Sequence, residues 1–575
     1  MFCLFIFITF SCEYDGVPKP DEEERDNDDT TYTVTEPSDG SIATGVSGDF
    51  PVFMSYSEAD HRLKSGIKNQ IGLYEFSQIR RIDLTFTSAN WAETLQAYAT
   101  GNTELVATIG YEGVSLPYKV GVRYKGSSGT AEDAVQKKSY NIAIDFVNTN
   151  QNLNGYYTLV LNGAYLDHSF LHEVVYRHCI NKYVPAAQVS YVNLHINGED
   201  YGLYANTQHL NATFLKEWFL SSLGTRWRAE PDESGVGTVA GEYGTGYSGL
   251  NYLGEDKIAY DPYYDVKKSH KENPYEDLIA VARVLEKTDP DSMENEIGKV
   301  LDLDRTLWLL ACENIFTDED SYVNKGGTDY YLYWESETKR LTPLEYDGND
   351  TFSPDNQNWD PFYHVEDSRF PLLNKLLIVP AIRQKYLAHY RTIIEETYNP
   401  EYLGAMIDNY AAKIDSAIKA DPKKRMTYNE FKIAVAEMKS VVSQRHQFLS
   451  THDSIAVDGL NIADVSWQAA NTQWLNPSST DTVLVKASIT GGGVSSVYLC
   501  ASTGMVGSFK RLQMFDDGTH GDKKAGDKVF SALINPQSSG VRVRFYIEAV
   551  RGNTSRTRSY FPARAEHDVF SYIVR

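Results

Sequence analysis

The order in which two kinds of hydrophobic pattern follow one another along the chain most constrains its fold. Between residues 50 and 160, apolar residues recur at every second position in several stretches, the spacing of half-buried strands. Residues 88–100 have helical spacing instead. The strand-like stretches are 81–86, 118–124 and 140–146. This region is therefore predicted to form a sheet with few helices.

One amphipathic helix and a hairpin come next. Apolar residues at helical spacing predict a helix over 167–183, with Asp167 and Ser169 as candidate N-terminal caps. A predicted strand over 189–196 leads into Asn197-Gly198, a dipeptide typical of tight hairpin turns, and a return strand over 201–205.

Residues 275–455 predict a helical region interrupted by one small hairpin. The hairpin strands are expected at 329–334 and 339–344. The helices are expected at 275–287, 304–316, 370–398, 401–420 and 428–449. A sheet with one helix, a linker and a helical lobe that carries a hairpin is the layout of a two-lobed kinase.

The pattern changes again at about residue 457, where short strands alternate with Gly, Asn and Ser turns. Strands are expected at 482–487, 496–500 and 541–549. The predicted fold class is therefore α+β: a two-lobed, atypical protein-kinase-like domain over 48–455, and an all-β, Ig-like or fibronectin III-like sandwich over 457–575.

The charge balance argues against two classes of partner. Lys plus Arg number 54 and Asp plus Glu 78, so the net charge is −24. A nucleic-acid binder normally carries a basic face, and docking on an anionic membrane needs a polybasic patch. The sequence also has no run of 18 apolar residues, so no membrane-spanning helix is expected.

The N-terminus predicts export from the cytoplasm. Residues 2–10 form an apolar run that is too short to span a bilayer and has the character of a signal-peptide core. Ser11-Cys12 follows it, and residues 1–12 resemble a bacterial lipoprotein signal in which Cys12 is lipidated. The alternative is an ordinary secretory signal cut nearby.

Residues 13–47 are acidic and almost free of large aliphatic side chains, which predicts an extended, disordered tether. An acidic stretch directly after the lipidated cysteine resembles the surface-export signal of Bacteroidetes lipoproteins. We expect a protein of the cell envelope, held at the outer-membrane surface or otherwise outside the cytoplasm, which touches the membrane only through a lipid anchor.

An ordered set of motifs between about residues 50 and 450 resembles the CotH kinase family, whose founding members are spore coat proteins. The motifs are Arg123 to Ser128, Lys137 to Tyr140, Leu161-Asn162 with Asp167, Val192 to Tyr204, Thr317 to Tyr322, Tyr330 to Tyr333 and Pro343 to Asp350. The resemblance implies a remote protein-kinase-like fold and phosphorylation of proteins with ATP and a divalent metal, Mg²⁺ or Mn²⁺.

In the first lobe, the resemblance implies that Lys137 or Lys138 contacts the nucleotide phosphates. The plain alternative is two solvated lysines at a strand end. Glu173, on the one helix of this lobe, is the candidate partner of the lysine. The further candidates for nucleotide binding are Arg123, Lys125 and Gln208, the last at a position where the family has Glu.

In the second lobe, the resemblance implies that Asp320 is the catalytic or metal-binding carboxylate. Asp347 follows the second strand of the hairpin and is the candidate metal ligand. The further candidates for the metal are Glu345, Asn349 and Asp350.

The chain departs from the family at several of these places. Leu344-Glu345 stands where many members have Trp-Asp, and Thr328-Asp329 where many have paired Asn. Two functions therefore remain open: a protein Ser/Thr kinase that acts on surface or secreted proteins, and a catalytically weak kinase fold that serves as a protein- or glycan-binding module.

Three further features have weaker implications. Gly244 to Gly249 matches G-x-G-x-x-G, but no strand or helix pattern flanks it, so a flexible loop is expected. Cys179, Cys312 and Cys500 are expected to be buried thiols, and a bond between the first two stays open. Asp516, Asp517, Asp522 and Asp527 lie in a turn-like stretch that suits either calcium or simple turn formation.

Overall fold

A computed structural model describes residues 16–18, 54–66, 72–99, 103–125, 137–165, 167–229, 247–327, 329–469, 477–505 and 507–575. The predicted signal peptide with Cys12, most of the tether and the beginning of the glycine-rich loop at 244–246 lie outside these residues. Residues 16–18 lie in the predicted tether, yet they form a short strand, β1, that pairs with residues 103–105.

The N-terminal part is a sheet that closes on itself like a barrel. Its strands in order are β1 (Gly16–Pro18), β5 (Thr103–Tyr111), β4 (Arg80–Thr85), β10 (Val189–Ile196), β11 (Glu199–Gln208), β9 (Thr158–Asn162), β8 (Tyr140–Ala143) and β7 (Val120–Tyr124). The strand β5 also pairs with β7, which closes the sheet, and with the short β6 (Val114–Ser115). Alternate side chains such as Ile82, Ile109 and Val122 fill the interior, because strand residues alternate between two faces.

Closure distinguishes this sheet from the expected lobe. Helix α1 (Trp91–Ala97) contacts β5 and β7, whereas α3 (His172–Ile180) packs into the core of the helical body. The N-terminal part is thus a barrel-like sheet, and the two-lobed kinase layout expected from the pattern order is not confirmed.

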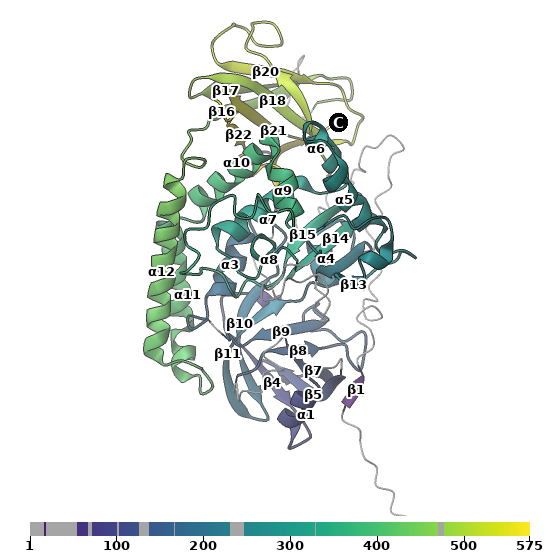
Figure 1. Cartoon of the computed structure of the whole chain (residues 1–575), viewed down its shortest axis with the longest axis vertical. Helices are drawn as coiled ribbons and strands as arrows, with labels where there is room; N and C mark the ends of the chain where they lie inside the picture. The colour runs from purple at the N-terminus through teal and green to yellow at the C-terminus, as the bar shows by residue number, and fades with distance from the viewer. Residues whose placement is uncertain are drawn as a thin grey trace, which may run out of the picture.

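A helical body follows the barrel and encloses a second sheet (Figure 1). Its helices are α4 (Ala212–Trp218), α5 (Glu276–Lys287), α6 (Pro290–Ile297), α7 (Leu303–Ile315), α8 (Tyr322–Lys325), α9 (Pro371–Leu377), α10 (Pro380–Glu396), α11 (Pro400–Ala420) and α12 (Tyr428–Thr451). The sheet has the order β13 (Tyr264–Lys268), β12 (Thr225–Ala229), β14 (Tyr330–Glu335) and β15 (Arg340–Glu345). The expected hairpin is therefore the β14–β15 half of a larger sheet.

Long helices α11 and α12 form a hairpin along one side of the molecule, and its connecting loop reaches down to the barrel (Figure 1). Asn399 caps the first of them and Thr427 forms a capping box with Glu430 at the start of the second. The predicted helix over 370–398 is two helices, because Pro380 starts a new one after the extended residue Val379.

The C-terminal sandwich contains strands from both ends of the chain. One sheet has the order β16 (Asn461–Ala469), β17 (Val483–Thr490) and β20 (Val529–Ile534). The other has the order β19 (Lys510–Met514), β18 (Val494–Thr503), β21 (Arg542–Arg551), β23 (Asp568–Ile573), β3 (Arg62–Ser65) and β2 (Met54–Ser57), with β22 (Arg558–Phe561) paired to β21. Residues 54–65 therefore belong to the sandwich and not to the first domain, where the sequence had placed them.

The prediction of buried thiols is confirmed within the described residues. Cys179, Cys312 and Cys500 are buried free thiols, so the first two are not joined. No helix in this part of the chain has the length and apolar character needed to cross a bilayer.

Candidate active site

A cavity of about 280 Å³ lies between the barrel and the helical body. The barrel contributes the ends of β7 and β9, the residue before β8 and Ala205 of β11, and α3 contributes Glu173. The loops that follow α7 and β15 contribute the opposite wall. The polar residues of the lining are Lys125, Ser139, Asn162, Asp167, Glu173, Asp320, Asp347, Asn349 and Asp350.

One wall of this cavity carries a cation held by a relay of hydrogen bonds. Lys125 follows β7 directly, and its Nζ donates to Asn162 Oδ1 at 3.1 Å. Asn162 Nδ2 donates in turn to both carboxylate oxygens of Glu173, at 3.0 and 2.7 Å. Glu173 is therefore linked to Lys125 through the side-chain amide of Asn162, and Lys125 is the lysine of the site.

The position of Glu173 is fixed by its other partners. Thr207 Oγ1 donates to it at 2.8 Å, and Arg177, one turn along α3, lies 3.3 Å away. Helix α3 is itself fixed at its start, where Asp167 accepts hydrogen bonds from the backbone N–H groups of Ser169 and His172. This carboxylate satisfies backbone donors that the first turn of a helix leaves free.

The opposite wall is acidic. Asp320 and Asp350 face the cavity from two loops that are joined by a backbone hydrogen bond of 3.0 Å from Glu319 N to Asp350 O. Burial raises the pKa of Asp350, and the neighbouring Asp320 adds to this effect. Burial also raises the pKa of Asp320, against the opposing effect of Lys325.

Asp347 lies between these two walls, with its carboxylate 3.8 Å from Lys125 Nζ. Burial raises the pKa of Asp347, although Lys125 opposes the shift. Burial likewise disfavours the charge of Lys125, but Asp347, Tyr346 and Glu173 together outweigh it and raise the pKa of the lysine. Asp320, Asp347 and Asp350 thus share a cavity with Lys125, and their raised pKa values indicate that the protein's own cations only partly offset the charge of these carboxylates.

Hard oxygen donors that are short of positive charge suit a divalent cation such as Mg²⁺. Asp347, Asn349 and Asp350 come from one short loop and line one cavity, so these residues fit the metal that the sequence predicted. The cavity's basic wall fits the phosphates of a nucleotide.

Several predicted site residues lie elsewhere. The Nζ of Lys137 forms a buried ion pair with Asp421, in the loop between α11 and α12, and it also contacts the rings of Phe170 and Tyr204. Lys138 lies over the ring of Tyr124. Neither lysine lines the cavity, so the geometry supports Lys125 in their place.

The remaining candidates also have structural partners. Arg123 Nε lies 3.9 Å from buried Glu104, and Gln208 Nε2 donates to Glu217 at 2.7 Å. Glu345 is buried in an ion pair of 2.6 Å with Arg177, and burial raises its pKa to about 7. Glu345 thus holds α3 in place through Arg177 and does not line the cavity.

Sequence reasoning missed the roles of Asn162, Arg177 and Lys325. The position of Asn162 directly after the apolar residues 159–161 and before a glycine was a usable signal for a residue at a cavity edge. Arg177 lies four residues after Glu173, the spacing of neighbours on a helix, which was a second signal.

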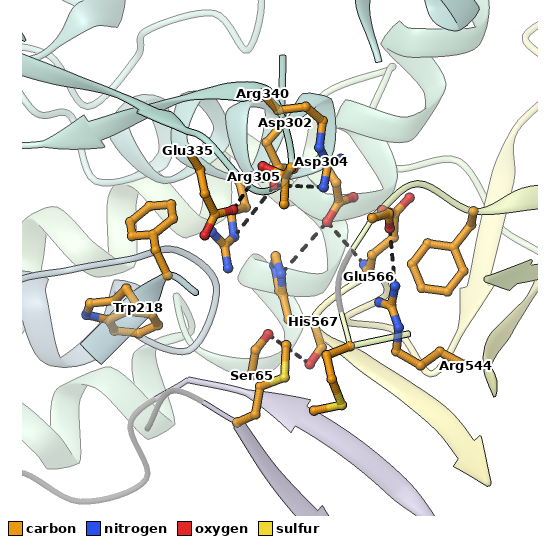
Figure 2. Close-up of a pocket in the computed structure, with 16 residues that line it drawn as sticks. Ser65, Trp218, Asp302, Asp304, Arg305, Glu335, Arg340, Arg544, Glu566 and His567 are labelled. Carbon is orange, nitrogen blue, oxygen red and sulfur yellow. Dashed lines mark hydrogen bonds and ion pairs between the residues drawn. The ribbon is translucent and has the colours of Figure 1, made fainter. Parts of the chain in front are cut away.

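A second, smaller cavity of about 60 Å³ lies where the helical body meets the sandwich (Figure 2). Asp304 of α7 faces His567 there, and it accepts hydrogen bonds from His389 Nε2 at 2.9 Å and Glu566 N at 3.1 Å. Lys385 bridges Asp304 and Glu566, at 3.0 and 2.9 Å. These charged groups come from both the helical body and the sandwich, and they neutralise one another. The cavity is therefore part of the interface between the two.

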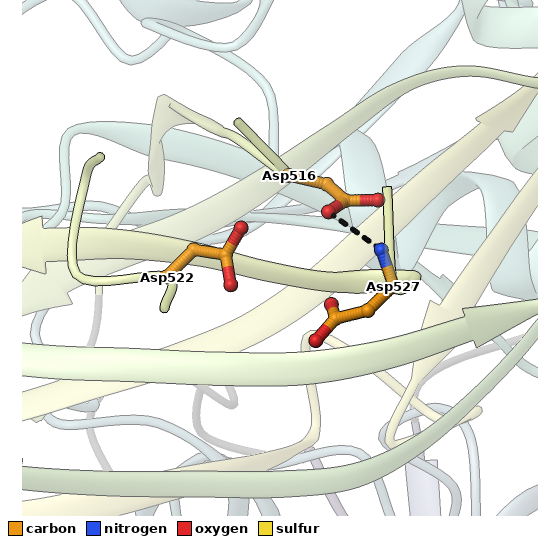
Figure 3. A group of neighbouring side chains, drawn as sticks. All are labelled: Asp516, Asp522 and Asp527. Atoms are coloured by element: carbon orange, nitrogen blue, oxygen red, sulfur yellow. Dashed lines mark hydrogen bonds between the residues drawn. The ribbon is translucent and has the colours of Figure 1, made fainter. Parts of the chain in front are cut away.

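The acidic turn of the sandwich groups Asp516, Asp522 and Asp527, with ligand atoms within 4.8 Å of one another (Figure 3). Asp516 accepts the backbone N–H groups of Gly526 and Lys528 at 2.7 and 3.0 Å. Asp522 similarly accepts two backbone N–H groups, from residues 518 and 524. These hydrogen bonds show that Asp516 and Asp522 stabilise the turn. Calcium binding stays a prediction.

Comparison with known proteins assigns the two parts of the chain. Residues 122–449, more than half of the chain, match the model of the family described as CotH kinase protein. Residues 494–561 match the second Ig-like domain of conditioned medium factor. A search of curated proteins finds no significant match. The chain is therefore a member of the CotH kinase family that carries an Ig-like domain after its CotH domain.

Proposed function

We propose that this protein is a CotH-type kinase that transfers the γ-phosphoryl group of ATP to Ser or Thr of surface or secreted proteins. The observation that carries this proposal is the cavity in which Lys125 faces Asp320, Asp347 and Asp350. Phosphoryl transfer needs a cation on the phosphates, carboxylates for a metal, and a carboxylate for the attacking hydroxyl. These elements lie around one cavity.

Each residue has a distinct role in this proposal. Lys125 binds phosphate oxygens, and Asn162 and Glu173 hold its ammonium in place. Asp347, with Asn349 and Asp350, holds the metal. A divalent ion, when bound, withdraws charge from the phosphates. Asp320 orients the substrate hydroxyl and accepts its proton, since the loop after α7 places this carboxylate on the open cavity.

The proposed setting is extracytoplasmic, at the cell envelope. It rests on the sequence alone: the apolar run of residues 2–10, Cys12 as the lipidation site and the acidic segment that follows. The partners would be a nucleotide and an exported protein, and the membrane would be contacted through the lipid only.

A second candidate function is a binding module with little catalysis. It is favoured by Glu345, which stands where many members have Asp and is buried in its ion pair with Arg177. The two functions differ in phosphoryl transfer, which requires that nucleotide binds together with a divalent metal.

The test measures thermal unfolding of the purified protein with ATP and Mg²⁺ or Mn²⁺. A ligand present at about 100 times its Kd stabilises the native state by about 2.7 kcal/mol. We expect a metal-dependent rise in Tm that Asp347→Ala abolishes. Asp408→Ala is the matched control, because its exposed carboxylate on α11 pairs with Lys439 at 2.6 Å and lies outside the cavity lining. If Tm rises with no combination of nucleotide and metal, the kinase proposal fails and the binding module is the remaining function.

Transfer is then measured with γ-labelled ATP and an exported-protein fraction as acceptor. Label on Ser or Thr that is lost in Asp320→Asn would support the kinase. Nucleotide binding without phosphoryl transfer would support the binding module.

A further inference from the structure

Lys325 places an ammonium group among the carboxylates of the acidic wall. It is the last residue of α8, and its Nζ forms ion pairs with Asp320 and with Asp329 at 2.8 Å. Asp320 lines the cavity, and Asp329 immediately precedes β14. One cation therefore bridges two carboxylates that come from opposite ends of a short segment.

The local backbone fixes this arrangement. Ser321 directly precedes α8, and its carbonyl accepts the N–H of Lys325 at 2.8 Å. Gly326 then reverses the chain with φ +67°, and a Cβ at this position would lie 2.7 Å from the ring of Phe370. A side chain is thus disfavoured there by backbone and by space, so the turn holds Lys325 against the two carboxylates.

The surroundings leave the ammonium charged. Lys325 is largely buried, with 17% of its side chain exposed. Burial disfavours its charge, but Asp329 and Asp320 outweigh this effect and raise the pKa of the lysine. A second cation, Arg228, lies 3.7 Å from Asp329. The Asp320–Asp329 pair is therefore already neutralised by groups of the protein itself.

A metal ion that bridged Asp320 and Asp329 would need the position that the ammonium holds. Asp347 and Asp350 line the cavity itself, and Asp347 lies 3.8 Å from Lys125 Nζ. Lys325 thus bridges one pair of carboxylates, whereas Asp347 and Asp350 face the space in which a metal would lie.

We propose that the Lys325 ammonium takes the place of a second metal ion, so that the site binds one divalent ion, at Asp347, together with the nucleotide. This inference rests on the proposed function and specifies its metal requirement. The lysine then supplies a fixed positive charge next to Asp320, the carboxylate assigned to the substrate hydroxyl.

The experiment counts bound Mn²⁺ by electron paramagnetic resonance of the free ion, with the full chain and a non-hydrolysable ATP analogue at saturation. We expect one Mn²⁺ per wild-type chain. Lys325→Met and Lys325→Gln are expected to bind two, since each frees Asp320 and Asp329 while the Gln variant retains a hydrogen-bond donor. Lys325→Arg is expected to bind one.

Lys375→Met is the control, since Lys375 is on α9 and pairs with Glu286 at 2.9 Å, away from the cavity lining. Two ions in the wild-type protein, or one ion in both uncharged variants, would overturn the inference while leaving the kinase proposal in place. Absence of any Mn²⁺ and nucleotide binding by the wild-type protein would instead overturn the proposed function, and the inference with it. The wild-type count decides the matter even if one variant fails to fold.

Discussion

Replacing Lys137 by Met distinguishes a structural lysine from a phosphate-binding one. The change removes the ammonium that pairs with Asp421 and leaves a carboxylate that is 1% exposed. Two backbone donors remain to it, Leu203 N at 3.0 Å and Lys423 N at 2.8 Å. Breaking a buried ion pair on one side costs about 3–5 kcal/mol. Since the two backbone donors persist, we expect a loss near the lower end, about 3 kcal/mol.

A double-mutant cycle gives the coupling within this pair. Asp421→Asn keeps an oxygen for only one of the two backbone N–H groups, since these donate to different carboxylate oxygens, and it leaves the lysine without a counter-charge. Burial already lowers the pKa of Lys137 to about 8, so loss of Asp421 is expected to neutralise the lysine near pH 7. In Lys137→Met with Asp421→Asn no charge is buried, and a loss of only about 1 kcal/mol is expected, which leaves a coupling of about 2 kcal/mol or more.

The assay combines urea unfolding with nucleotide titration of each folded variant. If Lys137 is structural, Lys137→Met loses stability while its folded form still binds ATP with the divalent metal. The opposite result, full stability with loss of nucleotide binding, would refute this reasoning and return Lys137 to the phosphate site that the sequence implied.

Three other perturbations follow from the structure. Gly202→Ala is expected to cost about 2 kcal/mol or more in urea unfolding, because Gly202 has φ +81° and a Cβ there would overlap Asp421, and an unchanged midpoint would contradict this. Burial lowers the pKa of His567 to about 3, so below pH about 6.5 the unfolded chain takes up a proton that the folded protein does not. The free energy of unfolding should therefore fall as the pH drops from about 6.5 towards 3, by up to about 1.4 kcal/mol per pH unit, and His567→Gln should reduce this slope, whereas an equal slope would argue against it. Deletion of residues 54–65 should leave β23 as an open edge and promote association, seen as a rise in apparent mass by light scattering, and a monomer of unchanged Tm would contradict the pairing.

Local patterns predicted most of the long helices, because each buries one face, and α7, α11 and α12 also begin at a residue whose side chain caps them. Closure of the barrel and the sheet that β12 and β13 add to the hairpin were not predicted. Both depend on pairings between distant segments, such as β5 with β7 and β12 with β14. Strand patterns determine which face is buried, but they do not state which strands become neighbours.

The same limit applies to the cavity. Residues next to recognisable strand ends, Lys125 and Asp347, were named from the sequence and lie together in the structure. Lys137 was assigned by its position at a strand end, but its side chain turns to Asp421, 284 residues further along the chain. The choice among three nearby lysines depends on this distant carboxylate, which local sequence does not indicate.

The pairing of β3 with β23 has a consequence for the order of events during translation. Arg62 of β3 and Asp568 of β23 are hydrogen-bonded although 506 residues separate them. On the ribosome, β2 and β3 emerge before most of the barrel and the helical body, and their partner β23 emerges after both. The barrel and the helical body lie between them in the chain and can form while these strands wait, so the sandwich is the last part to be completed. Its final pairing closes the polypeptide into a loop only when synthesis has passed the last strand.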